Sequence, residues 1–423
     1  MAKRIRRHTH HAGCVIFLLT GTNAWSILYQ EIPTSNEQVI DLAKYNSFDT
    51  LKLEIDEANV YVKEGTTFEL KVNSEFKKDI YINTNNNSLN ISANKIETFD
   101  LFNFLKEPKP IFEITVPANI KMSFTQDNGI LQIEKTNLSY LYVKMYQGNL
   151  ILKDSIINEG IIKSSNAGMN FLNTTINDLD LDASSGTIKL ENYLSNNTEI
   201  SNISTDLNIV NITTNELNVT TSKGNLNIDT IISDNINVEA GTGEIELINA
   251  VVTNKISLVT ASSANFTIGK SKASLTEITA VNGDIVMHEV DSKSVIKTGA
   301  NAIVNKCIGE YDITCLGNFL TVQECKFTNA IINAQKTEVS FKFIQADYIE
   351  YNGNDSMSTL YFVFGKNMKI EDYAGNLHFD NDKVIITSDN DLKLFDEYYL
   401  KIEKLIISPN ASYRVEEGTK LGE

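Results

Sequence analysis

The feature that most constrains the fold is a unit of 19 residues that recurs along the middle of the chain. Two adjacent copies occupy residues 222–247, with Gly224 and Gly243 at equivalent positions. In each copy, apolar residues stand seven and five places before the glycine and two and four places after it. This alternation predicts two short strands in which every second side chain faces the same way. Glycine suits a tight bend between them because it tolerates positive φ.

The same spacing continues in both directions from this pair. The equivalent positions, called anchors below, are Gly129, Gly148, Ala167, Gly186, Thr205, Gly224, Gly243, Ala264, Gly283, Ala300, Asn318 and Thr337. A repeat of this length, built of strands without a helical pattern, is typical of a solenoid. Each unit is too short for a four-stranded propeller blade but matches one coil of a parallel β-helix, whose strands stack about 4.8 Å apart. The sequence therefore predicts an all-β fold, a single parallel β-helix (β-solenoid) with coils of about 19 residues.

Four segments are expected along the chain. Residues 1–24 have a basic head, a short apolar run and small residues, the layout of a secretory signal peptide. Residues 34–120 alternate like strands but lack anchors, and we interpret them as an N-terminal β section that caps the solenoid. Within them, the apolar segment 99–110 is expected to cover the open end of the core, with a docking patch for a partner or lipid as the alternative. Residues 121–395 would form the coils, and residues 396–423 a C-terminal cap strand and polar tail.

The repeat loosens after Thr337 but its spacing returns twice. Gly375 is followed at the second and fourth places by Leu377 and Phe379, and Asn390 by Leu392 and Leu394. We predict that these two units form the last coils.

The charge of the chain argues against two classes of partner. Its formal net charge is −17. Without the four basic residues of the N-terminal segment, 33 Lys and Arg face 54 Asp and Glu, a net charge of −21. Such a surface repels nucleic acid and anionic membranes. The N-terminal apolar run is too short to span a bilayer, so we predict that the chain is not an integral membrane protein. A surface glycan or a protein remains open as the partner.

Several segments together resemble a known family. The opening FDTLKLEIDEANVYVKEGTTFELKV is followed by SLNISAN, IFEITVP and then DNGILQIEKTNLSYLYVKMYQGNLIL. This order is similar to that of the bacterial adhesin-type families, including the head GIN domain. The resemblance covers about residues 45–400 and implies a right-handed β-solenoid. It transfers no functional residues, because the family has no agreed site.

Acidic residues gather on two predicted outward faces and form the candidate ligand patch: Asp206, Glu244, Glu246 and Asp284 on one face, and Asp180, Asp182 and Glu199 on the other. A cation or a glycan could use either group; the alternative is a solvated face that keeps the solenoid soluble. Enzymes built on β-helices need paired carboxylates, or carboxylates that hold calcium beside a basic residue. No arginine is expected near these acids, and neither His288 nor His378 falls beside them. We therefore predict no catalytic residue, cofactor or metal ligand.

Three cysteines remain after removal of the predicted signal peptide. Cys307 and Cys325 each lie seven places after an anchor, so they should occupy the same corner in consecutive coils. Stacked positions about 4.8 Å apart fall within the Cα separation that a disulfide accepts. In an oxidising compartment we predict a disulfide between Cys307 and Cys325. A reduced, buried stack of the two thiols and a pair that involves Cys315 remain as alternatives.

These observations favour an exported, non-enzymatic structural or adhesive module of a bacterial envelope, located in the periplasm, at the cell surface or outside the cell. One alternative is a carbohydrate-active β-helix enzyme, either a polysaccharide lyase or a hydrolase. Another is a periplasmic protein that binds a partner through one end of its solenoid.

Overall fold

The computed structural model describes residues 37–41, 48–73, 80–85, 87–93, 109–354, 356–373, 376–380, 385–386, 391–394, 398–401, 404–407 and 412–415. All of them belong to one compact unit, Glu37–Glu423. No helix occurs among these residues, so none of them forms a helix long and apolar enough to cross a membrane. The predicted signal peptide lies outside the described residues, as does most of the apolar segment 99–110.

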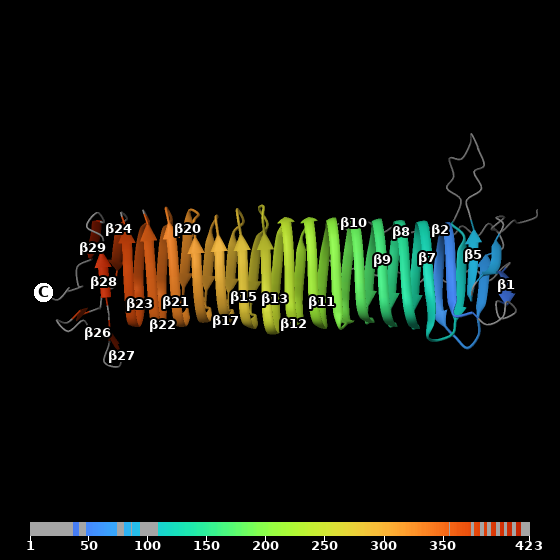
Figure 1. Cartoon of the computed structure of the whole chain (residues 1–423), viewed down its shortest axis with the longest axis horizontal. Coiled ribbons are helices and arrows are strands. Elements are labelled where there is room, and N and C mark those ends of the chain that lie inside the picture. The colour runs from blue at the N-terminus through green and yellow to red at the C-terminus, as the bar shows by residue number, and fades with distance from the viewer. Residues whose placement is uncertain are drawn as a thin grey trace, which may run out of the picture. The chain divides into compact units, whose positions relative to one another are not determined.

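The centre of this unit is a stack of long, bent strands that wind coil on coil (Figure 1). They are β7 Ile120–Glu134, β8 Asn137–Lys153, β9 Ile156–Leu172, β10 Thr175–Leu194, β11 Asn197–Lys223, β12 Leu226–Thr242 and β13 Glu244–Thr260. Each pairs in parallel with the next. The register advances by one repeat at each step, so that Ile209, Ile228 and Leu247 are successive Cα partners. The predicted parallel β-solenoid with coils about 19 residues apart is confirmed.

Alternate side chains of these strands fill the interior. In β12, Leu226 and Ile228 are 2% and 1% exposed, and Asn227 between them faces outward. Every apolar residue that the spacing rule placed two or four positions after an anchor is buried. Because the register is in phase, each inward side chain packs on its counterparts in the coils before and after it. The result is one core cluster that extends from Leu51 to Tyr351.

Glycine at the anchors has a steric reason. The backbone at Gly148 has φ of 119°, and a Cβ there would lie 1.9 Å from the carbonyl oxygen of Gly129 in the previous coil. A side chain would therefore force the two coils apart. The positive φ expected of glycine at this bend is present at Gly129, Gly148, Gly186, Gly224 and Gly243 but not at Gly283.

A second bend, which the spacing rule did not reveal, lies six places after each anchor. The residues there have φ between 47° and 61°: Lys135, Asp154, Asn173, Asn192, Asn211, Thr230, Asn249, Lys270, Glu289, Lys306, Glu324 and Phe343. Asparagine tolerates this left-handed region better than most residues. Here it also links coils, since Asn173 donates through Nδ2 to Asp154 Oδ1 (2.9 Å) and Asn192 donates to Asn173 Oδ1 (2.9 Å). Asn211 extends the same ladder by donating to Asn192.

Thr230 is the one β-branched residue among the twelve at this corner, and such a side chain is strained at its φ of 61°. We expect Thr230→Asn to raise the free energy of unfolding by about 0.5–1 kcal/mol, by relieving the backbone strain and by extending the asparagine ladder. Urea unfolding followed by circular dichroism measures the change. Thr220→Asn is the control, since Thr220 is exposed on an ordinary strand of β11 and should gain nothing. Equal gains at both sites would contradict the prediction.

After β13 most coils divide into two shorter strands. They are β14 Asn265–Gly269, β15 Lys272–Ala280, β16 Ile285–His288, β17 Asp291–Thr298, β18 Ala302–Asn305, β19 Ile308–Cys315, β20 Phe319–Gln323 and β21 Lys326–Gln335, followed by the longer β22 Glu338–Asn354 and β23 Met357–Tyr373. The even-numbered and the odd-numbered short strands form two parallel rows that rejoin at β22. A register shift between Val252 and Lys255 accompanies the longest repeat, 21 residues.

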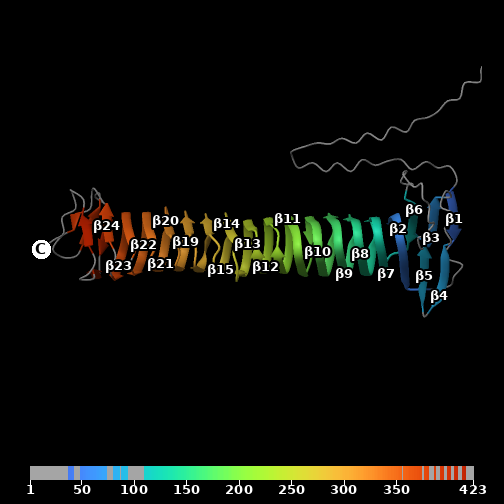
Figure 2. The same ribbon diagram turned by 90° about the horizontal axis from the view of Figure 1, so that it is seen from above.

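At the N-terminal end the strand order departs from the chain order (Figure 2). The strands are β1 Glu37–Asp41, β2 Thr50–Glu64, β3 Glu69–Asn73, β4 Tyr81–Asn85, β5 Ser88–Ala93 and β6 Ile111–Val116. β2 lies between β7 on one side and β5 and β6 on the other, parallel to all three. β3 and β4 then pair antiparallel with β6 and β5, and β1 pairs antiparallel with β3. Part of the predicted N-terminal section thus already stacks in the coil register, and the four-part division of the chain stays a prediction.

At the other end one predicted coil is in register and one is wrong. β24 Asn376–Asp380 continues the parallel stack, with Leu377 opposite Ser358. The next strands of the stack are β28 Lys404–Ile407 and β29 Ser412–Val415. The segment after Asn390, β26 Asp391–Leu394, instead pairs antiparallel with β25 Ile385–Ile386 and β27 Tyr398–Lys401 in a separate sheet. Two alternating leucines suit a hairpin as well as a coil, so their spacing alone could not distinguish them.

Candidate functional site

Three of the predicted acidic residues belong to a hydrogen-bonded ladder that joins coils. Asp206, Glu244 and Asp284 lie one place after their anchors on alternate coils, and Asn225, Asn265 and Asn301 occupy the coils that follow them. Asp206 Oδ1 accepts the backbone N–H of Asn225 (3.0 Å), and Asn225 Oδ1 accepts that of Glu244 (3.0 Å). Glu244 Oε1 then accepts the side-chain amide of Asn265 (2.9 Å).

The ladder continues through Asp284, whose Oδ1 accepts both the backbone N–H and the side-chain amide of Asn301, each at 3.0 Å. Asn301 Oδ1 accepts the backbone N–H of Phe319 (3.1 Å). Alternation of carboxylates with carboxamides separates the like charges and gives each acid a donor from the following coil. These acids therefore have a structural role in the stack.

The other predicted acids are exposed on the strand faces. Asp180 and Glu199 are Cα partners on adjacent coils, Asp182 lies two residues along the same face of β10, and Glu246 lies two residues after Glu244. The structure thus brings Asp180, Asp182 and Glu199 together as predicted from the repeat. Among the described residues, no group of three or more His, Cys, Asp or Glu side chains is arranged to hold a metal ion. Whether either acidic group binds a ligand stays a prediction.

The two kinds of acid should respond differently to truncation. We expect Asp284→Ala to lower the free energy of unfolding by about 1–3 kcal/mol, because the N–H groups of Asn301 lose their acceptor. Asp182→Ala should change it by less than about 0.5 kcal/mol, because Asp182 is exposed on its strand. Chemical denaturation of both variants at one pH measures the difference. Equal losses would mean that the ladder does not contribute to stability.

The two cysteines predicted to share a corner do so. Cys307 and Cys325 are buried, free thiols, and the backbone N–H of Cys307 donates to Cys325 Sγ (3.4 Å). Each thiol also donates to the carbonyl oxygen two residues before it, at Asn305 (3.3 Å) and at Gln323 (3.1 Å). Cys315 is buried at a different corner, with its Sγ near the carbonyl oxygen of Ala300 (3.4 Å).

Hydroxyl groups make the same bond in other coils. Ser155, at the equivalent place, donates to the carbonyl oxygen of Lys153 (2.8 Å), and Ser271 donates to that of Gly269 (2.7 Å). This carbonyl also accepts a backbone N–H from the preceding coil, as Lys153 does from Lys135 (3.0 Å), so the Ser, Thr or Cys side chain supplies a second donor. The recurrence of Ser and Thr seven places after the anchors could have indicated this hydrogen bond from the sequence.

Contact between the two thiols shifts their pKa values in opposite directions. The hydrogen bond to Cys325 lowers the pKa of Cys307, and it raises the pKa of Cys325 well above the ordinary range, with burial adding to the rise. Burial also raises the pKa of Cys315. Thiolate is the nucleophile in thiol chemistry, so we expect Cys307 to react before Cys325.

Several solved structures are similar to this chain at low identity. A "putative cell adhesion protein" from Clostridium sporogenes ATCC 15579 is 15% identical, with a TM-score of 0.22, and the match covers 50% of this chain and 97% of that one. A "putative adhesin" from Bacteroides fragilis NCTC 9343 is 15% identical, with a TM-score of 0.24, over 63% and 97%. A "putative lipid binding protein" from Parabacteroides distasonis ATCC 8503 is 11% identical, with a TM-score of 0.19, over 75% and 97%. No curated protein matches the chain.

The family of the chain is shown by a match to a family model. The model of the Toastrack DUF4097 family covers residues 48–304, which include β2 and the regular coils that follow β6. The predicted membership of a β-solenoid family is therefore confirmed, and this chain belongs to the Toastrack DUF4097 family.

Proposed function

We propose that this chain is an exported, non-enzymatic β-solenoid module with a structural or adhesive role in a bacterial envelope or at the cell surface. The observation that carries the proposal is the use of polar side chains between coils. Carboxylates and carboxamides that could have formed a reactive centre instead accept N–H groups of the next coil at Asp206, Asn225 and Asp284. These contacts favour an elongated scaffold, because they stabilise the stack along its axis.

The N-terminal segment and the net charge support the same proposal. Residues 1–24 have the layout of a secretory signal peptide, and the net charge of −17 keeps the surface soluble and repels nucleic acid. An exported scaffold of this kind acts by presenting its long faces to other molecules. Membership of the Toastrack DUF4097 family adds no reaction to this picture.

Two measurements test the proposal. Protease treatment of intact cells that carry the full chain should remove it if it is displayed outside, and protection until the envelope is opened would place it in the periplasm. Incubation of the purified chain with polysaccharides, with and without calcium, should release no products. Turnover that is lost in Glu244→Gln or Asp182→Asn would establish the carbohydrate-active alternative in its place.

A further inference from the structure

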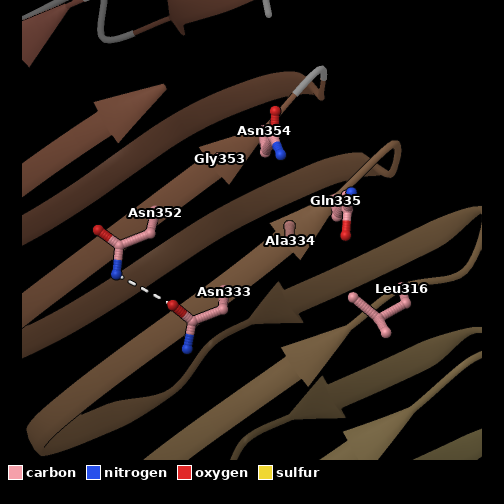
Figure 3. A pocket seen from close by; sticks show the side chains of 7 residues that line it. All are labelled: Leu316, Asn333, Ala334, Gln335, Asn352, Gly353 and Asn354. Atoms are coloured by element: carbon pink, nitrogen blue, oxygen red, sulfur yellow. Dashed lines mark hydrogen bonds between the residues drawn. The ribbon is translucent and has the colours of Figure 1, made fainter. Parts of the chain in front are cut away.

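A pocket of about 310 Å³ opens on the C-terminal half of the solenoid, between β21 and β22 and the turn that follows β19 (Figure 3). Its main lining is a two-by-two array of carboxamides. Asn333 of β21 is the Cα partner of Asn352 of β22, and Gln335 is the partner of Asn354. Ala334 and Gly353 lie between them and also line the pocket. The volume is at the small end of ligand pockets.

The array offers donors and acceptors that the chain does not use up. Asn352 Nδ2 donates to Asn333 Oδ1 (3.0 Å), and this bond fixes the orientation of both amides. Within the described residues, Asn333 Nδ2 and Asn352 Oδ1 have no further partner. Gln335 adds another exposed donor and acceptor pair at the rim. A ligand that carries several hydroxyl groups can donate to and accept from such amides at once.

One flank of the pocket is apolar. Leu316, in the turn after β19, is 55% exposed and contributes an aliphatic surface beside the amides. No acidic or basic side chain lines the pocket, so it has nothing to neutralise a phosphate, a carboxylate or a metal ion. It also holds no titratable group that could act as an acid or base, so the chemistry of its lining is that of binding.

From this combination we infer that the pocket binds a neutral sugar residue of a glycan. Hydroxyl groups of the sugar hydrogen-bond to the Asn333 and Asn352 amides, and its C–H face packs on Leu316. The inference rests on the proposed function and deepens it by naming the class of ligand that the module binds. It also explains why an exposed leucine stands beside four carboxamides.

The test uses the full chain and follows the methyl resonances of Leu316 by NMR during titration with neutral oligosaccharides, namely cello-, malto-, manno- and xylotetraose. At least one should shift these resonances saturably, with a dissociation constant of about 1 mM or tighter. The double variant Asn333→Ala/Asn352→Ala should weaken that binding at least about 10-fold, because the oriented amides are lost.

The matched control is Asn208→Ala/Asn227→Ala. These residues form the same kind of amide pair between adjacent coils, with Asn227 Nδ2 donating to Asn208 Oδ1 (3.1 Å), but they lie outside the pocket. The control should bind as the unmodified chain does. Absence of any shift with all four sugars, or an equal loss in the control, would overturn the sugar site and leave the non-enzymatic proposal standing. Cleavage of a bound tetraose would overturn the non-enzymatic proposal and leave the site standing.

Discussion

Replacing Leu247 with aspartate is expected to unfold the coils on either side of it. Leu247 is 1% exposed, and its Cα partners Ile228 and Ile268 are buried to the same degree. A carboxylate there has no partner and costs several kcal/mol, or must take up a proton. In a solenoid each coil is stabilised mainly by its neighbours, so the damage should centre on residues 226–268. Hydrogen exchange should show lost protection in these coils and retained protection in distant ones such as β8.

The control is the adjacent residue. Glu246 is exposed on the same strand, between Ile245 and Leu247, and Glu246→Lys should change the free energy of unfolding by less than about 0.5 kcal/mol. Asn227 is a poorer control, because its side chain bonds Asn208 in the previous coil. If Leu247→Asp and Glu246→Lys had equal effects, the alternation that defines inside and outside would be wrong.

The core could be predicted because it depends on spacing alone. Inward and outward positions alternate along each strand, and the 19-residue period fixes which of them stack, so Ile228 and Leu247 could be assigned to the core from the sequence. The left-handed corner could not be predicted in the same way. Asn192 is a residue that favours such a bend, but Lys135 and Phe343 occupy it too. The stack over-determines the backbone there, so local preference is a weak guide.

Pairing between strands that are far apart in the chain could not be predicted from the spacing either. Ala58, Val60 and Val62 obey the anchor spacing, and Ala58 is the partner of Gly129. Their coil was missed because the chain leaves it and forms β3 to β6 before it returns as β7. Sequence spacing describes successive coils, whereas this coil pairs with a strand 71 positions later.

The structural role of the acids in the ladder could not be predicted for a related reason. The N–H group that donates to Asp284 belongs to another coil, so the sequence alone indicates only a charged residue on the surface.

The candidate pocket had a partial sequence signal. Asn333 and Asn352 stand 19 residues apart, as do Gln335 and Asn354, so their stacking follows from the repeat. The contribution of Leu316 does not, because it depends on the path of the turn between β19 and β20. A hollow is a property of several coils together, and no single repeat encodes it.

A mild thiol oxidant such as diamide is expected to join Cys307 to Cys325 in the folded chain. The register pairs on either side, Asn305 with Gln323 and Ile308 with Lys326, place the two residues on adjacent coils. Their Cα atoms are then about 4.8 Å apart, within the range of a disulfide. The thiolate of Cys307 adds to the N=N bond of diamide, and Cys325 Sγ then attacks Cys307 Sγ. The new S–S bond replaces the S–N bond, and diamide leaves as its reduced hydrazine with both electrons and both protons. Because the pKa of Cys307 is lowered, the reaction should begin at a lower pH than for an ordinary cysteine and accelerate as pH rises.

The bridge would close a loop of about 18 residues, which stabilises the folded chain by about 3 kcal/mol in the chain-entropy model. Two weak S–H bonds, to Asn305 and Gln323, are lost in exchange. The midpoint of thermal unfolding should therefore rise after oxidation, and digestion without reductant should yield one peptide pair that joins Cys307 to Cys325. Cys325→Ser is the matched control: its hydroxyl keeps the corner bond, as Ser271 does, but it forms no bridge and should show no rise. A peptide that links either residue to Cys315 would contradict the stacking of these two coils, whereas two thiols that resist oxidation would establish the reduced pair as the working state of this corner.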